Sequence, residues 1–137
     1  MANEAVIIEL LGTPAGHPVR YIVADGTAIT KGALMVVTDP RTAVAHSTGT
    51  TAFVGIAATN KVASDGQLSL ALYNYGIFDL TAAAAGVTTV GYNCALSATA
   101  NMISVNTAAI WLTGGMVGRC LESHANDEVA AVLVNVN

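Results

Sequence analysis

The sequence has very few charged side chains for its length of 137 residues. Charged residues make up 10% of it, whereas about 25% is usual in a soluble domain. Five Lys and Arg stand against nine Asp and Glu, so the formal net charge is −4. A protein that grips phosphate backbones needs clustered cations, and this balance therefore argues against a nucleic-acid partner. Because hydrophobic residues reach 53%, intrinsic disorder is excluded as well.

The charge deficit is concentrated in residues 80–118, which contain no charged side chain. Thr, Asn, Ser and Gly recur every few residues there, so no run is apolar enough to span a membrane. A soluble monomer ordinarily keeps a charged surface. We therefore expect the chain to hide surface in an oligomer or a larger assembly. The uncharged stretch is either the contact region or ordinary core with a Thr-rich loop.

Cysteine is equally scarce. Cys94 and Cys120 are too few for a disulfide framework and follow no zinc-ligand spacing, which favours buried, unreactive thiols. The N-terminal residues include Glu4 and Glu9 and lack the basic and apolar regions of a signal peptide, so synthesis in a cytosol is expected. Because neither a linker nor a repeat is visible, residues 1–137 are predicted to form one domain.

Short apolar segments separated by turn sequences predict an all-β fold with at most a short helix. Turn residues such as Asp-Gly, Asp-Pro and Gly-Gly pairs recur along the chain. The predicted strands are residues 6–11, 20–24, 33–38, 42–46, 52–60, 67–74, 76–80, 116–122 and 129–136. Short strands at this spacing are typical of a small barrel or sandwich.

The last two predicted strands form the clearest hairpin. Val132, Val134 and Val136 fall on one face of the final strand, and turn-forming residues precede it. Helix signals are few. Residues 81–85 form at most one or two helical turns, because so short a run does not sustain a helix alone. Residues 99–110 remain open between strand and loop.

Motifs that carry catalysis are missing. His17, His46 and His124 each lie in a predicted turn or at a strand end, outside any motif with a mechanism. Asp79 follows an aromatic-rich strand and is interpreted as a loop-anchoring carboxylate. We therefore predict no catalytic, cofactor-binding or metal-binding residues. The single tryptophan, Trp111, is interpreted as an anchor in the core or in an interface.

The middle of the chain resembles a known family. Between residues 32 and 79 it runs GALMVVTD, TAVAH, GTTAFVGIAA and GQLSLALYNYGIFD. This hairpin, followed by a V-G-I-A strand, a Tyr-ending strand and a Phe-containing strand, is similar to the head decoration proteins of phage lambda and its relatives. The segment GMVGRCLE at residues 115–122 is similar to a broader group of viral capsid decoration proteins.

The resemblance implies a compact β-rich domain of the β-tulip type that trimerises on the outside of a tailed-virus capsid. Such trimers sit at local threefold positions and stabilise the expanded, DNA-filled head. The implied partners are the major capsid protein and further copies of the chain itself, without a cofactor. The implied location is the outer surface of the virion.

In this family an N-terminal arm adds a strand to a capsid sheet, and residues 1–11 occupy the matching position, although this arm is shorter than in the lambda protein. Val6, Ile7, Ile8 and Leu10 are the residues expected to pair with the capsid. The further candidates for trimer or capsid contact are Trp111, Tyr75 and Phe78.

Two alternatives from other functional classes stay open at this point. A glycan-binding or fibre-like projection on the virion would use exposed aromatic side chains at Tyr73, Tyr75 and Tyr92 as its platform. A small hydrolase would use His46 or His124 with a nearby Asp.

Overall fold

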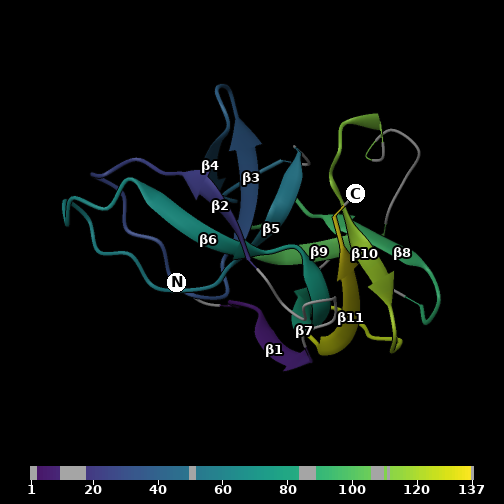
Figure 1. Cartoon of the computed structure of the whole chain (residues 1–137). Coiled ribbons are helices and arrows are strands. Elements are labelled where there is room, and N and C mark those ends of the chain that lie inside the picture. Colours follow the sequence, from purple (N-terminus) through teal and green to yellow (C-terminus); the bar gives the residue numbers. More distant parts are fainter. Residues whose placement is uncertain are drawn as a thin grey trace.

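The computed structural model describes residues 3–9, 18–49, 52–83, 89–105, 110 and 112–136. These residues form eleven strands, so the predicted all-β class is confirmed (Figure 1). The strands are β1 (Val6–Glu9), β2 (Val19–Ile22), β3 (Leu34–Thr38), β4 (Thr42–Ala45), β5 (Phe53–Ala57), β6 (Ser69–Tyr73), β7 (Tyr75–Ala82), β8 (Asn93–Leu96), β9 (Met102–Val105), β10 (Met116–Cys120) and β11 (Val129–Asn135).

Strands β2 to β6 close into a five-stranded barrel. Their order around it is β2-β4-β3-β5-β6, with β2 parallel to β4 and every other neighbouring pair antiparallel. The interior is filled by apolar side chains such as Val23, Met35, Leu70 and Leu72. Strands that alternate inward and outward residues fill so small a barrel completely, which leaves no channel.

Strands β7 to β11 form a second ring. The sheet order is β1-β7-β11-β10-β8-β9, and a parallel pairing of β7 with β9 closes strands β7 to β11 into a ring, with β1 outside it. Both rings follow one scheme. We number the five strands of each ring in chain order, from β2 to β6 and from β7 to β11. In both rings the first strand is parallel to the third and antiparallel to the fifth. The second strand lies between the third and the fourth, and the fourth pairs with the fifth. Of the two predicted architectures, a small barrel or a sandwich, the structure shows the barrel, and shows it twice.

A glycine occupies the same place in both barrels. Gly55 lies on β5 and Gly118 on β10, and a register shift interrupts the ladder beside each of them. A Cβ atom at either position would collide with a carbonyl oxygen of the following strand, that of Tyr73 or Leu133. Close backbone approach therefore requires glycine at both sites.

The two barrels bury a common core. Side chains that point outward from β3 and β5 pack against the interior of the second ring. This cluster includes Leu34, Val36, Phe53, Ile56, Phe78, Leu80, Leu96, Ile103, Val117, Val132 and Val134. A hydrogen bond also joins the two barrels in this region, where Oδ1 of the fully buried Asn101 accepts from the backbone N–H of Leu34 at 3.0 Å.

The structure corrects the start of the helical turn that is expected at residues 81–85. Thr81 and Ala82 are the last residues of β7 and pair with β9, and Thr81 also lies opposite β11. Pairing on two sides overrides the local preference of an Ala run for helix. Residues 84–88 lie outside the described part of the chain. Strand β8 was not predicted, and β9 resolves part of the open segment 99–110 as strand.

Candidate contact surfaces

Strand β1 places the expected arm residues at the edge of the second barrel. It pairs antiparallel with β7, where Val6 lies opposite Asp79. Val6 is 59% and Ile8 is 53% exposed, whereas the half-buried Ile7 packs against the common core. Because β1 is the outermost strand in the sheet order, its second edge has no strand partner among the described residues. Leu10 lies outside these residues.

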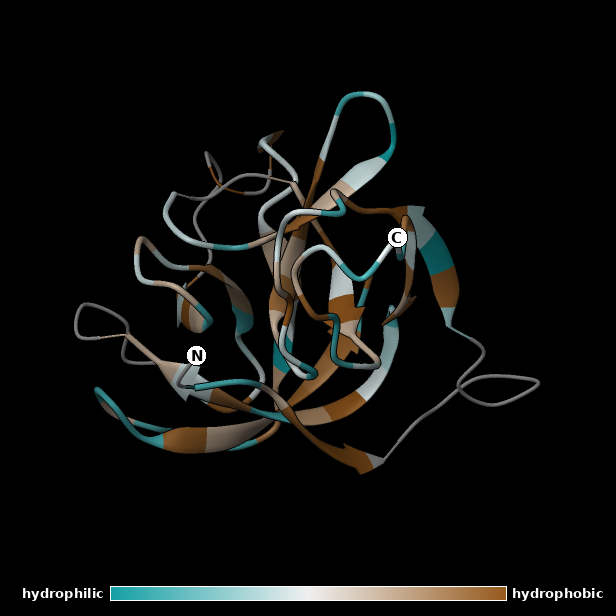
Figure 2. Ribbon diagram, turned by 90° about the vertical axis from the view of Figure 1, so that its left-hand side faces the viewer, coloured by the Kyte–Doolittle hydropathy of each residue, from teal (hydrophilic) through white to brown (hydrophobic). Residues whose placement is uncertain are grey.

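The N-terminal end of β1 is tied to the first barrel. The backbone N–H of Ala5 donates a hydrogen bond to the carbonyl oxygen of Gly32 at 2.7 Å. Figure 2 shows the apolar strand running along the periphery of the molecule from the N-terminus. An exposed strand edge with apolar side chains is a template for pairing with another chain. The predicted contact segment is therefore held in a form that a partner strand can join.

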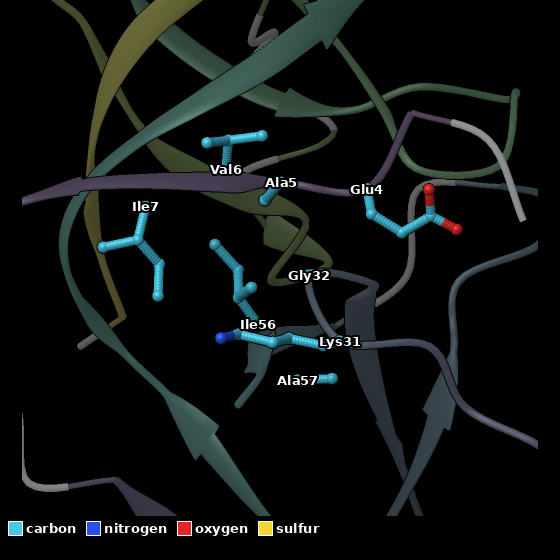
Figure 3. A pocket seen from close by; sticks show the side chains of 8 residues that line it. All are labelled: Glu4, Ala5, Val6, Ile7, Lys31, Gly32, Ile56 and Ala57. Carbon is cyan, nitrogen blue, oxygen red and sulfur yellow. The ribbon is translucent and has the colours of Figure 1, made fainter. Parts of the chain in front are cut away.

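A groove of about 540 Å³ lies beside β1. Its lining residues are Glu4, Ala5, Val6, Ile7, Lys31, Gly32, Ile56 and Ala57 (Figure 3). Ile7 and Ile56 extend into it from β1 and β5, and the Lys31 side chain reaches along it, whereas the Glu4 carboxyl group points away. Apart from Lys31 and Glu4 its lining is apolar, so the groove continues the exposed apolar surface of β1 onto the first barrel.

The aromatic candidates are placed differently from one another. Tyr75, at the start of β7, is 37% exposed, and Tyr92 is 60% exposed. Phe78 is completely buried, and its ring centroid lies 6.1 Å from that of the half-buried Tyr73. Trp111 lies outside the described residues. Of the two described aromatic candidates for trimer or capsid contact, Tyr75 and Phe78, a partner can therefore reach Tyr75.

The uncharged stretch of residues 80–118 divides between core and surface. Leu96 and Ile103 are fully buried in the common core. Val90 and Leu112 are 55% and 90% exposed. Part of the stretch is therefore core, as one of the two interpretations expects, and contact through its exposed apolar side chains stays a prediction.

The histidines make contacts with main-chain groups. His46 is buried, and its Nε2 lies 2.9 Å from the carbonyl oxygen of Gly49. His124 is buried as well, and its Nδ1 lies 3.3 Å from the carbonyl oxygen of Glu122. His17 falls outside the described residues. In the part of the chain that the structure describes, no three His, Cys, Asp or Glu side chains are grouped closely enough to hold a metal ion.

No helix within the described residues is long and apolar enough to cross a membrane.

A buried lysine ties together the loops at one end of the first barrel. Nζ of Lys61 donates hydrogen bonds to the carbonyl oxygens of Asp25 at 2.7 Å, Val62 at 3.1 Å and Thr27 at 3.2 Å. It also lies 3.2 Å from Oδ1 of Asp65, and its side chain is fully buried. An ammonium group surrounded by four oxygens satisfies its charge internally, so this cluster stabilises the loops that close the barrel.

Two groups have shifted pKa values. The pKa of the Asp65 carboxyl group is lowered from its ordinary value of 3.8, chiefly because the backbone N–H of Gln67 donates a hydrogen bond to the carboxylate. Desolvation opposes this shift, and the ammonium group of Lys61 adds to it. The pKa of the Cys94 thiol is raised, first by its hydrogen bond with Cys120 and then by burial. Both cysteines are buried thiols outside any disulfide, as the sequence predicts. A raised thiol pKa keeps Cys94 protonated and unreactive.

Together, the charge-poor double barrel and its exposed apolar edge strand define a small structural module that offers surface to other proteins. The family model of phage cement proteins matches residues 13–136, which cover both barrels and begin after β1. The chain therefore belongs to the phage cement protein family, a class of structural proteins associated with the phage capsid. No curated protein matches the chain. The predicted capsid association is confirmed at this level, and the closer likeness to the lambda proteins stays a prediction.

Proposed function

We propose that the protein binds the outer surface of a phage capsid as trimers at local threefold positions and stabilises the expanded, DNA-filled head. Membership in the phage cement protein family carries this proposal, and it supports the major capsid protein as the partner. The low charge of the chain and its exposed apolar side chains give further support, because such surface is covered in an assembly.

The stabilisation follows from linkage. A protein that binds the expanded shell and not the unexpanded one shifts the equilibrium toward the expanded shell by its binding free energy. A trimer contacts several capsid subunits at once, so contacts that are individually weak gain from multivalency. Small interfaces on each copy are therefore sufficient for firm attachment.

Strand β1 is the proposed capsid contact. It remains paired with β7, and a capsid strand pairs with its open edge while the exposed side chains of Val6 and Ile8 pack against the capsid. The groove beside β1 receives further apolar side chains of the partner. The expected strand addition by the arm is kept in this proposal, with the arm part of a folded sheet.

Co-sedimentation with capsids that lack the protein tests the role of β1. Replacing both Val6 and Ile8 with Ser removes apolar contact of about 1 kcal/mol at each site and is expected to weaken binding at least about tenfold. The matched control is Val62→Ser, because Val62 is 70% exposed in a loop of the first barrel and does not line the groove. Equal affinity of the double variant and the control contradicts the proposed contact.

The same assay, run on capsids before and after expansion, tests the proposed stabilisation. Saturable binding to expanded shells alone, with added resistance of those shells to heat, is the expected result. Equal binding to both shells contradicts selective stabilisation of the expanded head. Binding to neither shell overturns the proposal, and retention on a glycan array then favours a binding projection. Sedimentation equilibrium of the free protein shows whether trimers exist before attachment.

A further inference from the structure

The two barrels are copies of one structural unit down to the register of their strand pairs. Met35 lies opposite Ala45 in the first barrel just as Cys94 lies opposite Val105 in the second. Loop hydrogen bonds repeat too, from Gly32 N–H to Ala57 O and from Gly91 N–H to Cys120 O, with φ of +88° and +85° at the glycines. A position in one barrel therefore identifies its equivalent in the other.

This equivalence aligns β2 with β7. Ile22 of β2 and Thr81 of β7 each lie opposite the third strand and the fifth strand of their own barrel. Two residues earlier in each strand, Arg20 corresponds to Asp79. The surroundings of these two residues are alike on the side of the fifth strand, where Arg20 faces β6 and Asp79 faces β11. They differ on the other side.

In the second barrel that other side is occupied. Strand β9 pairs with β7 at Thr81 and Ala82, and β1 continues the edge with Val6 opposite Asp79. In the first barrel β4 pairs with β2 at Ile22, and no strand of the described residues continues the edge beside it. Among the described residues, the position that β1 fills beside β7 has no strand beside β2.

The main chain of Arg20 faces this open position. Its carbonyl oxygen accepts a hydrogen bond from Nη2 of Arg41 at 3.3 Å, and Arg41 directly precedes β4. The N–H and C=O groups of one residue lie on the same edge of an antiparallel strand, so the Arg20 N–H faces the open side as well. This is the orientation in which Asp79 meets β1. The Arg41 side chain thus donates the hydrogen bond that the backbone N–H of a neighbouring strand would otherwise give to the Arg20 carbonyl oxygen.

The open edge is positively charged. Arg20 and Arg41 are both exposed, and they are two of the five Lys and Arg residues of the chain. Nη1 of Arg20 lies 3.3 Å from Oγ of Ser69, and the Arg41 guanidinium lies 5.7 Å from the ring centroid of Tyr21. Asp39 is the one acidic residue in the adjacent β3–β4 turn. Two guanidinium groups against one carboxylate favour a segment that brings carboxylates of its own.

We propose that the open edge of β2 receives an extended, acid-bearing segment of the major capsid protein as an added strand, in the way that β7 receives β1. The inference rests on the proposed function, because it takes the capsid protein as the donor of the strand. It gives the chain a second strand-pairing edge on the first barrel, so that each copy holds the capsid through both of its halves.

Hydrogen exchange of the free protein and of the capsid-bound protein tests the proposal. Strand addition engages the Arg20 amide, so its exchange is expected to slow at least about tenfold on binding, while the loop at residues 62–66 stays unchanged. Capsid binding without this protection overturns the inference and leaves the proposed function standing. Failure of the protein to bind capsids at all overturns both. Protection that rises with the concentration of the free protein identifies a second copy as the donor and overturns the capsid assignment.

Charge reversal tests the acidic character of the segment. Arg41→Glu removes the guanidinium donor and adds a negative charge at the edge, and it is expected to weaken capsid binding about tenfold at low salt. Arg119→Glu is the matched control, because Arg119 is an exposed cation on β10 of the second barrel. Equal loss in both variants, or none in Arg41→Glu, overturns the proposed acid-bearing strand.

Discussion

Lys61 gives the sharpest test of how the first barrel is held together. We consider Lys61→Met, which keeps the length and much of the apolar stem of the side chain and removes the ammonium group. Three carbonyl oxygens and the Asp65 carboxylate then lose their shared donor. The backbone bridge between Ile29 and Lys61 is untouched by the change, so the strand geometry of the site is preserved.

The magnitude follows from the exposure of these acceptors. A hydrogen bond from a charged donor contributes about 1.5–3 kcal/mol, and removing one partner of a fully buried ion pair costs about 3–5 kcal/mol. Thr27 and Val62 are exposed residues, and the Asp65 side chain is 28% exposed, so water replaces part of what is lost. The substitution also removes the desolvation cost of burying the ammonium group, which offsets part of the loss. We therefore expect the free energy of unfolding to fall by about 2–3 kcal/mol.

Urea unfolding followed by far-ultraviolet circular dichroism measures this change. The midpoint is expected to fall without a change in the slope, since the native and unfolded surfaces stay the same. Lys31→Met is the matched control, because the Lys31 side chain is exposed, and its effect is expected within about 0.5 kcal/mol. If Lys61→Met is as stable as the control, the ammonium group does not hold the loops and the reasoning is wrong.

Two further predictions concern the stability of the fold. Gly118→Ala forces a Cβ atom against the Leu133 carbonyl oxygen and is expected to lower the free energy of unfolding by about 3 kcal/mol or more. The control Gly26→Ala, at an open position, is expected to leave the thermal midpoint nearly unchanged. Similar midpoints for both variants would refute the close approach of the two strands. The lowered pKa of Asp65 contributes stability that is present above its ordinary pKa of 3.8 and is lost as the pH falls through the lower folded value. The stability difference between wild type and Asp65→Asn should therefore shrink in urea titrations below about pH 4, and a constant difference from pH 7 to pH 2.5 would contradict the assignment.

The proposed contact surface was predictable from the local sequence only in part. The apolar pattern at Val6 and Ile8 pointed to a strand available for pairing, and both side chains are indeed exposed on a strand. The pairing of that strand with β7 was not predictable, because it joins residues about seventy positions apart. Phe78 was a candidate for trimer or capsid contact, and its inward place on β7 puts it in the core.

The class of fold was determined by the sequence alone. Each of the nine predicted strands overlaps an observed one, because alternating apolar residues and turn-forming residues act over a few positions. The hairpin of β10 and β11 is confirmed for the same reason. Strand β8 was missed because Asn93–Leu96 contains no β-branched residue; enclosure within the second ring, with three of its residues buried, makes it a strand.

Only the tertiary structure decided that the chain is built from two equivalent barrels. The halves share pairing register and a few residues, such as Gly55 with Gly118, while most matched side chains differ in chemistry, as Arg20 and Asp79 do. A ladder is specified by which residues face inward and by backbone hydrogen bonds, and many sequences satisfy both. Within the described residues, only the comparison of the two barrels in space shows that β1 fills an edge of the second barrel whose equivalent in the first has no strand beside it.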